Sequence, residues 1–519
     1  MKKAIAFAMA MMIGTVLLSG CGATVENAAD SQTTQENAAV QADSAEEAEV
    51  TDDITEIKLV LMSQGVVAGW DEVEAKINEI STREIGVKID VDWIEIGAWA
   101  QQMNLRLAAG DEMDLIMLTP MMSFENLRSV DQLMDITDEL QEYGQDILSI
   151  DSVYLPSTTV DGRIYGIPNN FVKGGFACID MREDVLEELG LLEKAEAMNS
   201  FSELEEILLA VNENTDLTPM FVTGQNGFGL TVLGSIDASS DSFDDIKALE
   251  SLGDPYSMIF ADPETDEVFC YYTTDSFRKD CERAAKFYSE GLLLADGANS
   301  SEPSITLFQA NTLFAHVNVS EPPKDREAMK NQYGYYLTGK ELASIPVTRS
   351  KANMWGMAVP YTSSNPEEAV AFINLLFTNE EAANLMLWGI EGRDYTMIGE
   401  GKVQVNQDAA FRNMPFFTPN SLICYDSMSG IENYSEEVKA AYDNQAYSKY
   451  MSFFCDNEPV QNALTACYSA KMEYVPALLC GSTTDWESAL DSFVQKLKDN
   501  GIDDVVAFYQ EQLDARIAE

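Results

Sequence analysis

The sequence predicts an α/β fold in which helices cover a largely parallel sheet. The first observation is a regular alternation of strand and helix patterns that begins at Ile54. The second is size, because the residues after Asp53 form a body of about 460 residues and 46% of the whole chain is apolar. A body of this length is expected to divide into two domains, since single hydrophobic cores stop growing well below it.

The opening of this body has the order strand, helix, strand, helix, strand. The stretch "ITEIKLVLMSQG" reads as a strand, and "DEVEAKINEISTREIG" places Val73, Ile77 and Ile80 at helical spacing before Gly86. "VKIDVDWIEI" alternates with period two, "GAWAQQMNLRLAAGDEM" has a helical pattern, and "DLIMLTP" reads as a short buried strand. This order is typical of parallel strands connected by helices.

The middle of the chain continues with turns, a further strand and two helices. In "VDGRIYGIPNN", Asp161-Gly162 is a tight-turn signal and Pro168 makes the following stretch extended. "GGFACIDMREDVLEELGLL" reads as a strand running into a helix that ends at Gly190. "NSFSELEEILLAVNEN" reads as a helix capped by Ser200 or Ser202. The last third reads as amphipathic helices, the final one over Asp503–Ile517.

The N-terminus reads as an export signal followed by a tether. Lys2 and Lys3 precede an apolar run too short to span a bilayer, and "LSGC" resembles the bacterial lipobox, so Cys21 is expected to carry the lipid, typically a palmitate, after removal of residues 1–20. The segment from Gly22 to Asp53 lacks aromatic residues and is rich in Ala, Glu and Gln. Such a composition predicts a flexible tether that holds the body just outside the membrane.

Charge and side-chain counts exclude several classes of function. A formal net charge of −55 repels nucleic acids and anionic lipid headgroups. His316 is the only histidine and lies in an apolar, strand-like stretch, which argues against zinc enzymes and Ser/His/Asp hydrolases. "DPETDE" lacks the spacing of an EF-hand calcium loop and is expected to be a turn. We expect neither a metal nor a cofactor, and the seven cysteines after Cys21 show no metal-ligand spacing.

These features in this order resemble the family 1 extracellular solute-binding proteins, the receptors of carbohydrate-type ABC importers. The resemblance rests on the lipobox, the acidic tether, the alternating opening, "DGRIYGIP", "FSELEEIL" and the return segment over residues 354–395, which ends in "WGIEGRDY". It covers essentially the whole mature chain, although the stretch from Thr223 to Phe277 matches no motif.

The resemblance implies a two-lobe fold of the type II periplasmic-binding-protein kind, with a helix-covered sheet in each lobe and a hinge of several strands. We expect lobe 1 over residues 54–175 and about 356–420, and lobe 2 over residues 176–355 and about 421–519. The implied function is capture of a carbohydrate, with an oligosaccharide favoured, between lobes that close around it, without catalysis. The implied partners are the membrane permease subunits of an ABC importer, and the receptor is expected to be a monomer anchored to the outer face of the cell membrane.

Sugar recognition requires flat aromatic faces and short polar groups. Tryptophans near strand ends or in loops, and polar residues after strands or in the Gly-bounded loop, are therefore the candidate ligand-binding residues: Gln64, Trp70, Trp99, Asn169, Asn170, Trp355, Trp388, Arg393, Asp394 and Tyr395. Two alternatives stay open. A secreted carbohydrate-active hydrolase could use two of the many carboxylates, and a receptor of this composition could instead bind a peptide or a polyamine.

Overall fold

The computed structural model describes residues 54–63, 66–150, 153–222, 235–300, 302–320, 322–427 and 431–518. The predicted signal peptide, Cys21 and the tether lie outside these ranges, and so does Gln64. Within the described ranges, no helix combines the length and the apolar character needed to cross a membrane.

The alternating opening of the fold is confirmed. The strands β1 (Thr55–Ser63), β2 (Val87–Glu95) and β3 (Leu115–Met117) are parallel, and α1 (Trp70–Ile85) and α2 (Trp99–Ala109) connect them. The first connecting helix ends where the sequence predicts, because the following glycine adopts a left-handed backbone with a φ of 69°.

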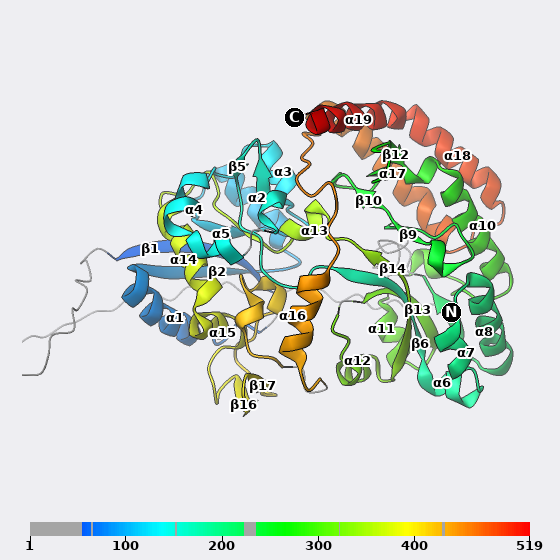
Figure 1. Cartoon of the computed structure of the whole chain (residues 1–519), viewed down its shortest axis with the longest axis horizontal. Coiled ribbons are helices and arrows are strands. Elements are labelled where there is room, and N and C mark those ends of the chain that lie inside the picture. The colour runs from blue at the N-terminus through cyan, green and yellow to red at the C-terminus, as the bar shows by residue number, and fades with distance from the viewer. Residues whose placement is uncertain are drawn as a thin grey trace, which may run out of the picture. The chain divides into compact units, whose positions relative to one another are not determined.

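A return segment completes this first sheet. The strand β15 (Met357–Ala358) pairs antiparallel with β3, which gives the order β15-β3-β1-β2. The helices α14 (Pro366–Thr378) and α15 (Glu380–Trp388) follow it, and their apolar faces join the core around β1 to β3. We call the part built on this core lobe 1 (Figure 1). The core continues to Phe417, and Tyr425 packs against a small adjoining cluster with Trp388.

The second sheet is mixed rather than parallel. Its order is β14-β6-β13-β7, formed by Leu337–Ile345, Gly175–Arg182, Leu313–Ser320 and Thr218–Phe221. β13 runs parallel to β7 and antiparallel to β6, and β6 and β14 are also antiparallel. The helix α8 (Phe201–Asn214) packs its apolar face against the same core as β6 and β13. We call the part built on this sheet lobe 2.

The C-terminal helices form a third core with a small antiparallel sheet. α17 (Gln461–Leu479), α18 (Trp486–Asp499) and α19 (Ile502–Ala518) share buried side chains with the sheet β10-β11-β12, which lies within residues 250–270. We call this part the C-terminal module. It adjoins lobe 2, because Cys480 at the end of α17 belongs to the lobe 2 core. The final helix agrees with the predicted one to within one residue at each end.

Three segments connect the lobes and lie side by side, as the predicted multi-strand connection requires. The Val347 N–H donates to the Ala446 carbonyl at 2.8 Å, and the Ser448 N–H donates to the Val347 carbonyl at 3.0 Å. The Gln445 side-chain oxygen accepts from the N–H groups of Lys173 and Gly174 at 3.1 and 2.8 Å. In chain order the crossings lie at Lys173–Gly174, at Val347 and at Gln445–Ser448. The Gln445 side chain therefore joins the first and third crossings, while the second crossing pairs with the third.

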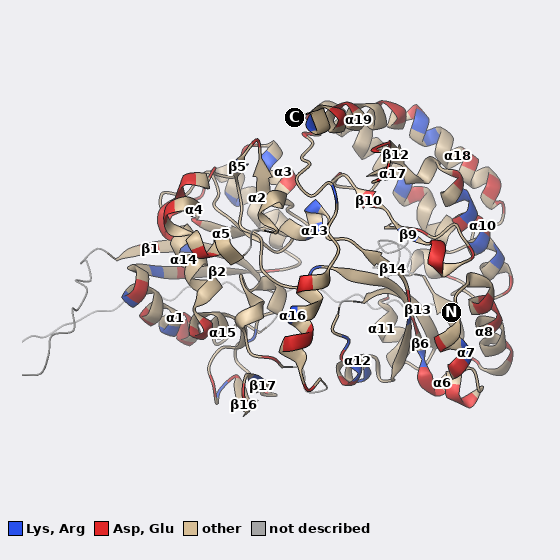
Figure 2. Ribbon diagram, viewed as in Figure 1, with Lys and Arg blue, Asp and Glu red and all other residues tan. Residues whose placement is uncertain are grey.

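Charged side chains lie mainly on outer helices. Figure 2 shows acidic residues on α1, on α4 (Thr137–Tyr143), on α6 (Glu183–Glu188) and on α16 (Tyr434–Asn444), with basic residues interspersed on α10 (Asp275–Ser289). This distribution is what a solvated acidic surface requires.

Candidate ligand-binding site

The carboxyl edge of the lobe 1 sheet gathers loops from distant parts of the sequence. The three parallel strands end at this edge, and the segment before the antiparallel strand β15 reaches it from the other direction. The Leu118 N–H donates to the Gly356 carbonyl at 2.8 Å, and Val66 forms a bridge with Arg412. Ligands of open α/β sheets bind outside the carboxyl ends of the strands, so this edge is the candidate site.

Large apolar side chains are exposed after each of these strands. Val66 follows β1, Ile96 follows β2 and Met121 follows β3, and their exposed fractions are 43%, 39% and 41%. Single exposed apolar residues are ordinary, but three at the ends of neighbouring strands form a surface that a ligand could cover.

Trp355 lies at the same edge and has a strained backbone. Its φ is 67°, which is uncommon for a bulky residue. The half-buried indole packs on Phe416 and Phe417, with ring centroids 5.2 and 5.1 Å away. Strain of this kind persists where the surroundings hold the residue in place, and it is frequent at ligand-binding positions. Of the four predicted tryptophans, Trp355 is the one that combines partial exposure with a position on this edge.

Two predicted amides lie directly behind this aromatic group. The Asn169 side-chain N–H donates to the Phe416 carbonyl at 2.9 Å, and that of Asn170 donates to the Asn420 side-chain oxygen at 3.1 Å. The amide oxygens of Asn169 and Asn170 and the Thr418 hydroxyl accept no hydrogen bond from any described residue. Buried polar atoms normally have a partner, and because these oxygens have no accessible surface, a buried water is the partner that would suit them.

The structure corrects the placement of the other predicted tryptophans, because Trp70, Trp99 and Trp388 are buried in the protein core. Trp70 begins α1 and packs against Trp93 and Phe411 with centroid distances of 5.2 Å to each. The Trp388 indole donates to the Tyr425 carbonyl at 3.0 Å.

The physical reason lies in the helical spacing. Trp70 continues the buried stripe that includes Val73 and Ile77, and Trp99 continues the stripe of Met103 and Leu107. The sequence contained this signal, and it was a better guide than proximity to a strand end.

The predicted Gly-bounded loop is a structural clamp rather than an exposed ligand contact. Asp394 is fully buried and accepts from the N–H groups of Ile390, Ala410 and Phe411 at 2.8, 2.8 and 3.0 Å. Burial alone would raise the pKa of this carboxyl, but hydrogen bonds from Arg393 and from backbone N–H groups outweigh it and hold the pKa below the usual range.

Arg393 and Tyr395 complete this clamp. Arg393 also donates to the Gly69 carbonyl at 3.1 Å, which ties the loop to the start of α1. Tyr395 is buried, and burial raises the pKa of its hydroxyl to about 12. These contacts position the loop beside the candidate edge and leave the Asp394 carboxylate without an accessible surface.

The single histidine lies in the lobe 2 sheet. His316 is buried against the rings of Phe308 and Tyr333, its Nδ1 lies 2.8 Å from the Ser304 hydroxyl and its Nε2 lies 3.5 Å from Asp180. Although these three residue types occur in hydrolases, the imidazole is 3% exposed and packs against two aromatic rings, as a core residue does. The predicted core histidine is therefore what the structure shows.

The possible metal ligands of the sequence include the carboxylates of "DPETDE" and the cysteines. Among the residues that the structure describes, no three His, Cys, Asp or Glu side chains are grouped as a metal site. "DPETDE" forms a turn in which the Asp262 carboxylate accepts from the N–H groups of Glu264 and Thr265 at 2.7 and 3.1 Å. The seven cysteines after Cys21 are free thiols, and six of them are buried.

Sequence reasoning missed the apolar residues after the strands and the segment that supports Trp355. Phe416, Phe417 and Thr418 lie in "NMPFFTPN", where two aromatic residues stand between prolines in a stretch without helical or strand periodicity. That composition is unusual for a loop and could have indicated a rigid aromatic surface.

Comparisons with known proteins agree with this architecture. A family model described as a domain of unknown function (DUF3502) matches residues 449–518, which span the C-terminal helices. The chain is 22% identical over 442 residues to a carbohydrate ABC transporter substrate-binding protein of Streptococcus pneumoniae, a match that covers 83% of this chain and 84% of that protein.

Solved structures of similar fold include sugar-binding proteins of two bacteria. The N-glycan transport solute-binding protein NgtS of Streptococcus pneumoniae has a TM-score of 0.75 at 20% identity, covering 89% of this chain and 98% of the other. A solute-binding protein of Bifidobacterium longum infantis, titled as binding HMO, has a TM-score of 0.62 at 17% identity, covering 89% and 99%. The chain therefore has the fold of the two-domain periplasmic solute-binding proteins, and the resemblance to the extracellular solute-binding proteins of carbohydrate ABC importers is confirmed.

Proposed function

We propose that this protein is the substrate-binding receptor of an ABC importer and that it captures an oligosaccharide at the carboxyl edge of lobe 1, where lobe 2 closes over it. The observation that carries the proposal is Trp355 at that edge. Its backbone is strained, its indole is half-buried, and amide oxygens lie behind it. Similar structures support the ligand class, since NgtS is known in complex with Man5GlcNAc and the Streptococcus pneumoniae protein FusA in complex with kestose.

The chemistry of the site fits a sugar. The apolar C–H face of a pyranose ring stacks on an indole, and sugar hydroxyl groups bind short polar groups beside such a ring. We assign the first contacts to Trp355 and to Gln64, which follows β1 in the sequence, and a positioning role behind the ring to the buried Asn169 and Asn170. Closure by lobe 2 is favoured because only the closed form gives the ligand a second set of contacts.

Lipid attachment at Cys21 would hold the monomeric protein on the outer face of the membrane, where permease subunits accept the ligand. The carbohydrate is expected to leave chemically unchanged. A hydrolase would have to cleave its ligand, and a polyamine receptor would bind with an affinity that falls steeply with salt.

The test is a thermal-shift screen of the purified full-length protein against a carbohydrate panel. A ligand at 100 times its dissociation constant adds about 2.7 kcal/mol to the folded state, which corresponds to a rise in Tm of about 3 °C for a body of about 460 residues. Chromatography of the recovered oligosaccharide separates a receptor from a hydrolase. The proposal fails if spermidine or a peptide raises the Tm and no carbohydrate does, or if the recovered oligosaccharide is shortened.

A further inference from the structure

A short segment between the third crossing and α17 packs against both lobe 1 and the C-terminal module. We call Ser448–Cys455 the strap; in Figure 1 it runs from α16 past α13 (Arg349–Asn353) toward the C-terminal helices. Phe453 is buried in the core of the C-terminal module, with its ring 6.5 Å from that of Tyr509. The next residue, Phe454, packs against the lobe 1 core, with its ring 6.4 Å from that of Phe124. Consecutive side chains of the strap are therefore anchored in different cores.

A buried guanidinium fixes the lobe 1 side of the strap. Arg349 is 2% exposed, and its guanidinium donates to the carbonyls of Pro156, Thr159 and Met451 at 3.4, 3.2 and 3.4 Å. Its charge lies between the rings of Phe124 and Phe454, 5.4 and 5.3 Å from their centroids. A buried charge persists only where it is well paired, so these contacts hold the strap, lobe 1 and α13 together.

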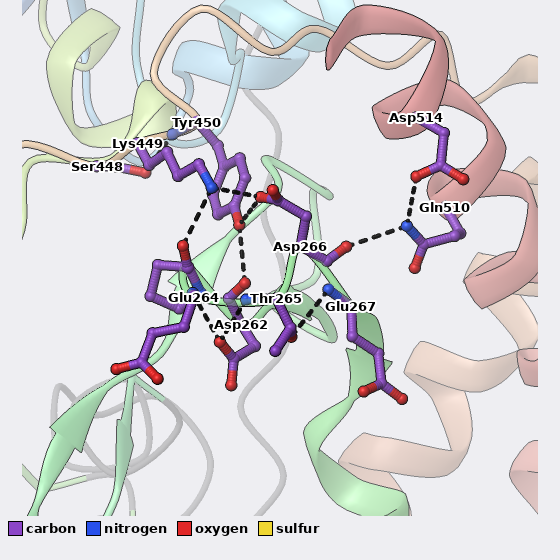
Figure 3. A network of polar contacts seen from close by, with 11 residues as sticks. Asp262, Glu264, Thr265, Asp266, Glu267, Ser448, Lys449, Tyr450, Gln510 and Asp514 are labelled. Carbon is purple, nitrogen blue, oxygen red and sulfur yellow. Dashed lines mark hydrogen bonds and ion pairs between the residues drawn. The ribbon is translucent and has the colours of Figure 1, made fainter. Parts of the chain in front are cut away.

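Polar contacts fix the other side of the strap to the C-terminal module (Figure 3). The Lys449 ammonium donates to the Asp266 carboxylate at 2.7 Å and to the Pro263 carbonyl at 3.1 Å. The Tyr450 hydroxyl lies 2.7 Å from the same carboxylate. Gln510 of α19 donates to the Asp266 carbonyl at 3.0 Å, so the final helix is part of the same network.

The position of the strap gives it a mechanical consequence. The three crossings lie side by side, an arrangement that allows one lobe to rotate about them with little disruption. A segment whose neighbouring aromatic residues are buried in different cores resists that rotation. When the lobes separate, either Phe454 must leave lobe 1 or Phe453 must leave the module.

We propose that the strap is an interlobe latch, locked by Arg349, that couples the C-terminal module to lobe 1 and limits how far the lobes open. Its effect on ligand exchange rests on the proposed function, whereas its effect on the lobe separation does not. With the latch engaged, the lobes stay near the geometry from which they close, and ligand is retained longer.

The test measures the lobe separation without ligand. Nitroxide labels at Leu105→Cys, on α2 and 64% exposed, and at Glu196→Cys, exposed on α7 (Leu192–Ala197), report the distance between lobes 1 and 2 by double electron–electron resonance. Cys21 and the partly exposed Cys424 are first replaced by serine, so that the label reacts at the two introduced thiols. Phe454→Ala and Arg349→Met are introduced into this full-length protein. The matched control is Phe508→Ala, because Phe508 packs only against the C-terminal core.

The expected result is a broader distance distribution with a longer mean in Phe454→Ala and Arg349→Met, and an unchanged one in Phe508→Ala. If Arg349→Met does not fold, Phe454→Ala decides. Distributions in Phe454→Ala that coincide with those of the control overturn the latch. Stopped-flow release of a bound oligosaccharide is expected to be several-fold faster in Phe454→Ala. Altered distances in a protein that binds no carbohydrate would support the latch and refute the proposed function. Carbohydrate binding with unaltered distances would support the proposed function and refute the latch.

Discussion

Replacing Trp355 with either glycine or alanine separates the backbone strain at this position from the use of its ring. A left-handed backbone costs an L-residue about 1–2 kcal/mol, and glycine avoids that cost. Both variants lose the ring contacts with Phe416 and Phe417, each worth about 0.5–1.5 kcal/mol beyond simple burial. Trp355→Ala keeps the strain at φ 67° and Trp355→Gly relieves it, so the glycine variant is expected to be the more stable by about 1 kcal/mol. In regular helices and strands the order of stability is the reverse, because there alanine is more stable than glycine.

Two measurements check this prediction. Thermal unfolding is expected to give Trp355→Gly a Tm about 1 °C above that of Trp355→Ala. Calorimetric titration with an oligosaccharide identified in the screen is expected to show an affinity loss of about 30-fold or more in both variants, because a buried aromatic anchor typically contributes at least about 2 kcal/mol. Trp486→Ala, in the C-terminal module, is the control and should bind normally. Equal or greater stability of the alanine variant would refute the strain argument, and unchanged affinity in both variants would refute the site.

Three further predictions concern stability. Asp394→Asn is expected to lower the free energy of unfolding by about 1.5–3 kcal/mol near neutral pH. Because the folded-state pKa of Asp394 is lowered, this loss should shrink as the pH falls below about 4. The difference in Tm between the variant and the wild type measures it. Burial raises the pKa of Asp280 to about 6, so the contribution of Asp280 to the stability of the wild type should fall as the pH rises from about 4 to 6. Asp280→Asn should therefore gain Tm relative to the wild type over that range, and a constant difference would contradict this. Ser200 caps α8 by accepting from the Glu203 N–H at 3.2 Å, and Ser200→Ala should cost about 1 kcal/mol in thermal unfolding without changing oligosaccharide affinity.

Local patterns determined most of lobe 1. The alternation of apolar residues with periods of two and 3.6 placed β1, α1, β2, α2 and β3 within a few residues of their observed bounds. Turn chemistry was equally informative, since Asp161 and Gly162 both adopt the left-handed backbone that a tight hairpin turn requires. The order of motifs then indicated the two-lobe family. These features are local, so one sequence suffices to detect them.

The site was only partly predictable. The position of Trp355 on the return segment and of Asn169 and Asn170 after Pro168 predicts all three as site residues. In the structure Trp355 and Asn169 meet at Phe416, and Asn170 bonds Asn420 close by in the same segment. Trp70 and Trp99 are predicted from positions near strand ends and are core residues, because each continues a buried helical stripe. Position near a strand end does not specify which way a side chain points, whereas helical spacing does.

The sequence by itself determined the strand and helix pattern of lobe 1, the export signal as an expectation, and the resemblance to solute-binding receptors. Only the tertiary structure decided that β6 runs antiparallel to both its neighbours, that Gln445 joins two of the crossings, and that Phe453 and Phe454 enter different cores. The physical reason is that these features depend on pairing between residues tens to hundreds of positions apart. Hydrophobic periodicity records whether a side chain is buried, but not which distant surface buries it.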